Sequence, residues 1–169
     1  HELGHRKPYF ERFISKFLYM PCLYMHFYIE HNFGHHLNVG TPEDGATAKY
    51  NQNVYSFWWS SVSKQYFGAW ERQLDLLKAQ KKGFISLKND VFWYHFIQAG
   101  YIFSIYYLFS LKVMLFAVVV GVLSFLFLET INYIEHYGLK RFKLPSGRYE
   151  RVQPHHSWNS NFNIGRIVL

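Results

Sequence analysis

The sequence has a single cysteine, Cys22, so an internal disulfide is excluded. Because Cys22 lies in an apolar run, we expect it to be a small buried residue. Acidic residues are also few, with 11 Asp and Glu against 18 Lys and Arg and a net charge of +7. The basic residues flank apolar runs and form no recognised nucleic-acid-binding motif, so we predict a lipid bilayer and no nucleic acid as a partner.

No signal peptide is visible, and the first residue is His1 rather than methionine. The last residues, IVL, lie inside an apolar stretch, so we expect an internal fragment of a longer protein. A length of 169 residues fits one domain. Aromatic residues make up 21% of the chain, and Tyr and Trp suit the headgroup level of a membrane. Ten histidines are also unusually many.

Three apolar segments are long enough to cross a bilayer, which takes about 20 residues. We predict spans over 9–29, 91–111 and 113–134, the first kinked at Pro21 and the last two joined by a turn at 110–112. A further, interfacial helix is expected over 55–82. TPEDGATA (41–48) is expected to form a turn followed by the start of a helix, which Thr41 could cap. The fold class is therefore all-α, a polytopic transmembrane helical bundle. The alternative for 91–134 is a buried helical hairpin in a soluble protein.

The flanks of the predicted hairpin are basic on both sides, at 78–88 and at 139–151. Two spans return the chain to the side that it left, and cationic flanks favour the cytoplasm. We therefore expect a multi-pass membrane protein whose histidine motifs all lie on the cytoplasmic side.

Those motifs carry the candidate metal ligands. In HELGH and EHNFGHH, the pairs His1/His5 and His31/His35 are four residues apart, which places each pair on one face of a helix. His36 is rotated by about 100° from its neighbour and is expected to reach a second ion. In ETINYIEHYGL, Glu129, Asn132 and His136 share a helix face, and polar faces in membrane helices are usually functional. The candidate ligands are His1, His5, His31, His35, His36 and His136.

Six imidazoles exceed what one tetrahedral zinc can use, so they indicate two ions or one ion of high coordination number. Imidazole suits iron as well as zinc. HELGH also matches the HExxH pattern of zinc proteases, with Glu2 as general base, but a protease does not need the second histidine cluster. Lone His26 and His95 are expected to be structural. For His155 and His156 we favour a role in supporting the ligands or in forming a loop over direct ligation.

Taken together, HELGH-R-K, EHNFGHHLNVGTPED-G-A and NYIEHYGL resemble the motifs of the membrane-bound alkane hydroxylases, the non-haem di-iron alkane 1-monooxygenases. The resemblance implies that 1–169 is one partial membrane hydroxylase domain in a bacterial inner membrane, with a cytoplasmic histidine-rich di-iron site and no catalytic residues beyond that centre. The six histidines above would be ligands of two iron ions. The family has earlier helices and a later box resembling LQRHSDHHA, so we expect the chain alone to be inactive.

The resemblance also implies the reaction, which is terminal hydroxylation of medium- or long-chain n-alkanes to 1-alkanols with O2. The electrons would come from rubredoxin, which is reduced by an NAD(P)H-dependent rubredoxin reductase. Polar residues near the ligands are expected to orient them, and the candidates are Glu2, Glu30, Glu129, Asn132 and Glu135. The alternatives are a hydroxylase of aromatic methyl groups similar to xylene monooxygenase, a fatty acid desaturase-like enzyme, and a non-catalytic membrane metal-binding protein.

Overall fold

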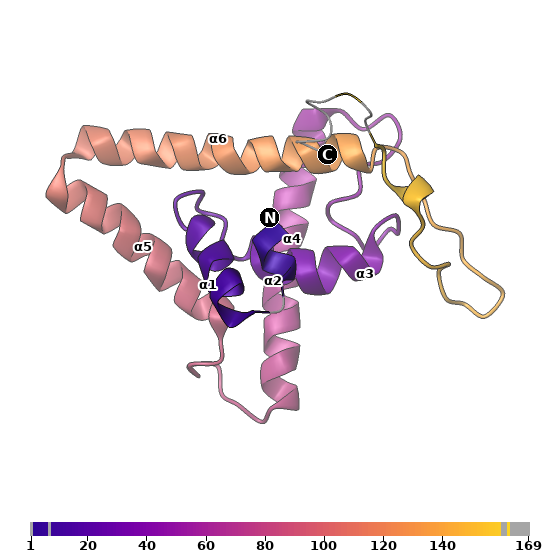
Figure 1. The fold of residues 1–169 in the computed structure, drawn as a ribbon, viewed down its shortest axis with the longest axis horizontal. Coiled ribbons are helices and arrows are strands. Elements are labelled where there is room, and N and C mark those ends of the chain that lie inside the picture. Colours follow the sequence, from indigo (N-terminus) through magenta and orange to yellow (C-terminus); the bar gives the residue numbers. More distant parts are fainter. Residues whose placement is uncertain (1, 7, 160–161, 163–169) are drawn as a thin grey trace.

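The structure is a computed structural model that describes residues 2–6, 8–159 and 162. Over these residues it is helical, and its β pairing is limited to an isolated bridge between Lys143 and Tyr149. The expected all-α class is therefore confirmed for this part of the chain. Figure 1 shows two long helices, α5 (Asp90–Leu108) and α6 (Leu111–Glu135), meeting at an acute corner, with α4 (Val54–Ala79) crossing near the far end of α6.

Helices α5 and α6 form the expected hairpin. The Asn89 side chain accepts a hydrogen bond from Phe92 N at the start of α5, and Ser110 does the same for Val113 N at the start of α6. Helix α6 is the one described helix that is long and apolar enough to cross a membrane. Val91 and Tyr94 are the buried apolar side chains of the hairpin, and the others are exposed or half-buried, so the alternative of a buried hairpin is not supported.

The first predicted span must be corrected, because 9–29 is not a continuous helix. Helix α1 (Tyr9–Leu18) ends before a series of turns, and α2 (Phe27–Glu30) begins after them. Pro21 lacks the N–H that a helix needs, and Leu23 adopts a positive φ of 54°. Ten helical residues extend about 15 Å, roughly half of the hydrocarbon thickness. Helix α1 therefore cannot span a bilayer.

Helix α4 confirms the helix expected at 55–82. Asn53 caps it by accepting a hydrogen bond of 2.9 Å from Ser56 N. Its buried residues recur every four positions, so they form one stripe that faces α2 and α6. The stripe consists of Phe57, Ser61, Gln65, Ala69, Gln73 and Leu77. The apolar core joins Ala69 to Met25, Tyr28, Ile29, Val91 and Tyr94.

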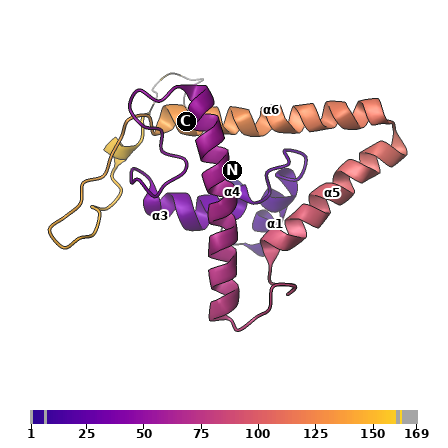
Figure 2. The same cartoon turned by 180° about the vertical axis from the view of Figure 1, so that it is seen from behind.

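The turn expected in the segment 41–48 is confirmed, but the helix start expected after the turn is wrong. The segment forms turns and irregular backbone, and Thr41 Oγ1 donates back to the Asn38 carbonyl at 2.7 Å instead of capping a helix. Beyond α6, residues 139–153 form an extended loop that projects from the helices, visible from both sides in Figures 1 and 2. The short helix η3 (Pro154–His156) follows it.

Candidate metal centre

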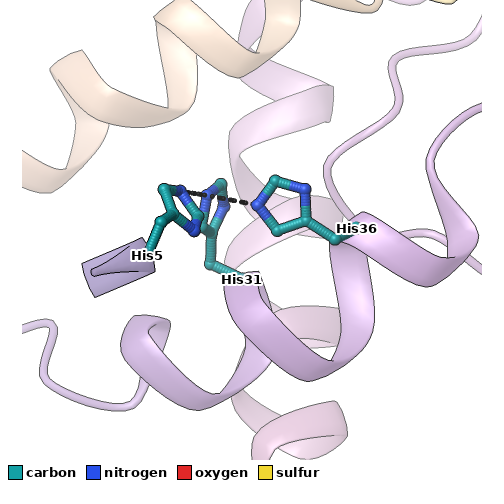
Figure 3. Close-up of side chains that lie close together, drawn as sticks. All are labelled: His5, His31 and His36. Atoms are coloured by element: carbon teal, nitrogen blue, oxygen red, sulfur yellow. Dashed lines mark hydrogen bonds between the residues drawn. The ribbon is translucent and has the colours of Figure 1, made fainter. Parts of the chain in front are cut away.

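Three histidines from separate short elements converge on one point (Figure 3). His5 ends the 3-10 helix η1 (Glu2–His5), His31 begins the π-helix η2 (His31–His35), and His36 begins α3 (His36–Asn38). The Nε2 atom of His31 lies 3.2 Å from that of His5 and 3.1 Å from that of His36. We call these three residues the first histidine group. His1 and the side chain of Glu2 lie outside what the structure describes.

The π-helix changes the predicted pairing of the histidines. A π turn joins residues five apart rather than four, so it brings His36 back beside His31. The expectation that His31 would pair with His35, while His36 reached another ion, is therefore wrong in its geometry. His35 instead points to a different set of neighbours.

That second set is formed by His35, His136 and Asp44. The His35 and His136 ring centroids lie 4.9 Å apart. Nδ1 of His35 donates to the Asp44 carboxylate, with distances of 3.1 and 3.0 Å to its two oxygens. Nδ1 of His136 donates to the His156 carbonyl at 3.1 Å. Both imidazoles thus keep Nε2 for a metal, and we call His35 and His136 the second histidine group.

Asp44 was not among the residues predicted for the site. It is buried, and it also accepts hydrogen bonds from Ala46 N at 3.2 Å and from the Thr47 hydroxyl. The motif TPED contains the residue, but its turn-like composition concealed the contact with a histidine nine positions earlier. A carboxylate that holds Nδ1–H of a ligand fixes its tautomer and makes the other nitrogen a stronger donor.

The electrostatics favour neutral imidazoles at His31 and His36. Burial, together with the neighbouring histidines, lowers the pKa of His31 to about 2 and that of His36 to about 4. Burial also lowers the pKa of His136. For His35, burial is outweighed by Asp44, so its pKa is raised. Neutral imidazole is the form that binds a metal, so His31 and His36 are ready to do so at neutral pH.

The geometry of the first group suits a metal ion. Two nitrogens bound to one ion at about 2.1 Å lie about 3.0 Å apart at a right angle and about 3.4 Å apart at the tetrahedral angle. The observed separations of 3.1 and 3.2 Å fall within this range. The His31 and His35 ring centroids are 5.4 Å apart, so the two histidine groups adjoin each other. An all-imidazole donor set fits iron, and it also fits zinc.

The other residues expected to orient ligands have varied surroundings. Glu129 is fully buried and accepts hydrogen bonds from Tyr24, Ser61 and Gln65, so it joins three segments of the fold. Asn132 is buried on the same helix. Glu135 accepts from Ser157 at 2.9 Å and lies 4.0 Å from His136 Nε2.

Glu30, also expected to orient a ligand, forms an ion pair of 3.3 Å with Arg72 of α4. Burial raises the pKa of the Glu30 carboxyl to about 7, with Arg72 opposing this effect. Glu30 is the residue immediately before the π-helix, which carries the candidate ligands His31 and His35 and leads directly to His36.

A further cluster of Glu150, His155 and His156 has less suitable chemistry. Nδ1 of buried His156 accepts a hydrogen bond from Gln153 N at 2.9 Å, so a neutral ring carries its proton on Nε2. That Nε2 lies 3.3 Å from Glu150 and donates to it. With both nitrogens engaged, His156 secures the loop rather than binding an ion, in line with the role favoured from the sequence.

A cleft of about 910 Å³ opens beside Asp44. Basic side chains dominate its charge, and they come from α4 and from the two loops at 40–52 and 139–149: Lys49, Lys64, Lys140, Arg141 and Lys143. Because Asp44 both lines this cleft and holds His35, the cleft is one residue away from the second histidine group.

The helices, with histidines gathered where separate short elements meet, define a histidine-rich helical protein that suits metal binding. The chain belongs to the fatty acid desaturase family, whose model matches residues 1–169. Its relatives include alkane 1-monooxygenase 2 of Pseudomonas aeruginosa, which is 36% identical over all of this chain and 45% of the relative. Alkane 1-monooxygenase 1 of Alcanivorax borkumensis is 37% identical over all of this chain and 42% of the relative.

A more distant relative is the hydroxylase component of the xylene/toluene monooxygenase of Pseudomonas putida. It is 28% identical over 99% of this chain and 43% of the relative. The chain therefore spans less than half the length of the curated relatives that it matches.

Proposed function

We propose that the protein is a membrane-bound monooxygenase that converts n-alkanes of medium or long chain to 1-alkanols. The observation that carries this proposal is the meeting of two histidine groups, His5/His31/His36 and His35/His136, in a chain similar throughout to alkane 1-monooxygenases. The reaction consumes R–H, O2, two electrons and two protons, and it yields R–OH and water.

The proposed cofactor is a pair of iron ions, one near each histidine group. Bound iron supplies O2 activation, which an alkane C–H bond requires because it offers no charge or leaving group to acid–base residues. The chain's own residues hold and orient the imidazoles: Asp44 fixes His35, and the His156 carbonyl fixes His136. His1 is proposed to join the first histidine group as a further ligand.

We propose rubredoxin as the electron donor, itself reduced by an NAD(P)H-dependent reductase. The basic cleft beside Asp44 supports a donor of acidic surface, because opposite charges speed association and set orientation. A donor docked in this cleft would lie against Asp44, which holds His35, so one side chain would separate the donor from His35.

The proposed location is the bacterial inner membrane, with α5 and α6 as two of several spans and the histidines on the cytoplasmic side. The exposed apolar side chains of both helices, the length and apolar composition of α6, and the basic loops at their far ends support this topology. An alkane that partitions into lipid would then reach the centre between membrane helices rather than through water.

The test is oxidation of octane by the full-length protein in membranes, with rubredoxin, its reductase and NAD(P)H under ¹⁸O2. We expect 1-octanol carrying one ¹⁸O atom, and its loss in His36→Ala but not in His26→Ala, since His26 lies in the turns before α2. A protein that retains iron and accepts electrons but forms no 1-octanol would contradict the proposal.

A second candidate is hydroxylation of aromatic methyl groups, favoured by the similarity to the xylene/toluene monooxygenase component. The same assay separates the two, because p-xylene can replace octane. Faster formation of the benzylic alcohol than of 1-octanol would favour this candidate.

A further inference from the structure

The carboxylate of Glu30 occupies a slot formed by two glycines from different helices. A Cβ added to Gly34 would lie 2.5 Å from the Glu30 carboxyl carbon, and one added to Gly68 would lie 2.8 Å from Glu30 Oε2. Gly34 belongs to the π-helix η2, whereas Gly68 belongs to α4. Neither position has space for a methyl group while the carboxylate remains, and Glu30 is 4% exposed, so it has little freedom to move aside.

Arg72 closes this slot and also touches the π turn. Its Nε lies 3.3 Å from Glu30 Oε2 and donates to the Phe33 carbonyl at 3.0 Å. Phe33 lies in the middle of η2. A donor from another helix that binds a carbonyl within a turn favours local departure from α-helical geometry. We call Glu30, Gly34, Gly68 and Arg72 the Glu30 slot.

The π turn decides which histidines meet. In a regular α-helix, residues 31 and 35 would face the same side and residue 36 would point about 100° away. The π turn instead brings His36 to within 3.1 Å of His31 and leaves His35 to Asp44. We propose that the Glu30 slot is a positioning device that holds this turn and thereby assigns His36 to the first metal ion and His35 to the second.

This inference rests on the metal centre of the proposed function, but it is tested by metal binding rather than by alkane oxidation. The experiment loads the full-length protein with Fe(II), then follows its release to a chelator. A second sample is loaded with Co(II), whose visible spectrum reports coordination geometry. The variants are Gly34→Ala and Gly68→Ala, and the matched control is Gly100→Ala, a helical glycine with nothing within 4 Å of an added Cβ.

We expect both slot variants to release iron at least about tenfold faster than the wild type and to change the Co(II) spectrum. Gly100→Ala should do neither. The methyl group of Gly34→Ala is expected to act by displacing the Glu30 carboxylate. Once Glu30→Ala has removed that carboxylate, adding Gly34→Ala should change the rate of iron release by less than about threefold. The helix content and the thermal midpoint of each variant are also measured, because a variant that releases iron faster and keeps both has lost iron affinity without unfolding.

Wild-type iron release and Co(II) spectra in both slot variants would overturn the inference, as would independent, additive effects of Gly34→Ala and Glu30→Ala. If Gly34→Ala does not fold, Gly68→Ala on the other helix decides by the same criteria. A wild-type protein that binds iron but oxidises no alkane would contradict the proposed function alone, because the slot is judged by metal release.

Discussion

Nδ1 of His35 lies 3.0 Å from Oδ2 of Asp44, and both side chains are buried. This contact links the basic cleft to the second histidine group, and it leaves Nε2 as the ligating nitrogen of His35. It also gives the motif TPED a physical role, because its aspartate orients a histidine of the preceding motif.

Replacing Asp44 by asparagine should weaken iron binding by about 10- to 100-fold, because the amide keeps the shape but loses the charge that strengthens His35 as a ligand. Iron retained after dialysis against a chelator measures the effect. Asp75→Asn is the control, since Asp75 is exposed and pairs with Lys78 on the surface of α4. Equal iron retention in the two variants would show that Asp44 does not support the metal.

The adjacent histidines of η3 should behave differently. His156 is 2% exposed and hydrogen-bonds to Gln153 N and Glu150, and its carbonyl holds His136, whereas His155 is exposed. His156→Ala should cost about 1–3 kcal/mol of stability and weaken iron retention, because it frees the loop that positions His136. His155→Ala should change neither thermal midpoint nor iron content. Equal losses in both variants would indicate that the pair binds a metal of its own.

The Glu129 network should be a major source of stability. Tyr24 donates to Oε1 of Glu129, Ser61 donates to Oε2, and Gln65 donates to both oxygens. Glu129→Gln would replace one of these oxygens by an amide N–H₂, so donors would face donors at that position in a buried site. We expect a loss of about 2–4 kcal/mol, seen as a lower thermal midpoint. Ser124→Ala is the control, because the half-buried Ser124 hydroxyl on the same helix donates only within that helix, to the Val120 carbonyl. A midpoint unchanged in Glu129→Gln would contradict this role.

Charge reversal in the cleft tests the proposed docking of the electron donor. Lys64→Glu combined with Lys143→Glu should raise the KM for rubredoxin several-fold and leave kcat nearly unchanged, because exposed charges mainly affect encounter. The effect should shrink as ionic strength rises. Lys82→Glu, exposed beyond the end of α4, is the control. If the double variant and the wild type have the same KM for rubredoxin, the cleft is not the docking site of the electron donor.

The sequence indicates which histidines are candidate ligands, but it does not indicate which of them belong to the first histidine group and which to the second. Histidine motifs, the hairpin at 91–134 and the helix at 54–79 follow from local composition and spacing. The π turn does not, because it depends on Glu30 meeting Gly68 and Arg72, which lie about 40 positions later. Local sequence also predicts only a kink at Pro21 in 9–29, where the structure has a series of turns between two helices. These turns depend on distant neighbours, which include Gly121 of α6.

Asp44 shows a second limit of local patterns. Its neighbours Thr41, Pro42 and Glu43 are typical of a helix start, and the actual turn is stabilised by His35, Ala46 and Thr47. A carboxylate nine residues from a histidine has no fixed spatial relation to it until the intervening turn is known.

Two adjoining histidine groups are proposed to hold two iron ions, and the decisive measurement is the iron content of the purified full-length protein. Metal analysis combined with Mössbauer spectroscopy should find about two irons per chain in the wild type, and fewer in both His36→Ala and His35→Ala. One iron or none per chain in a folded, metal-replete wild type, or an iron content unaffected by both substitutions, would contradict a di-iron centre at these histidines.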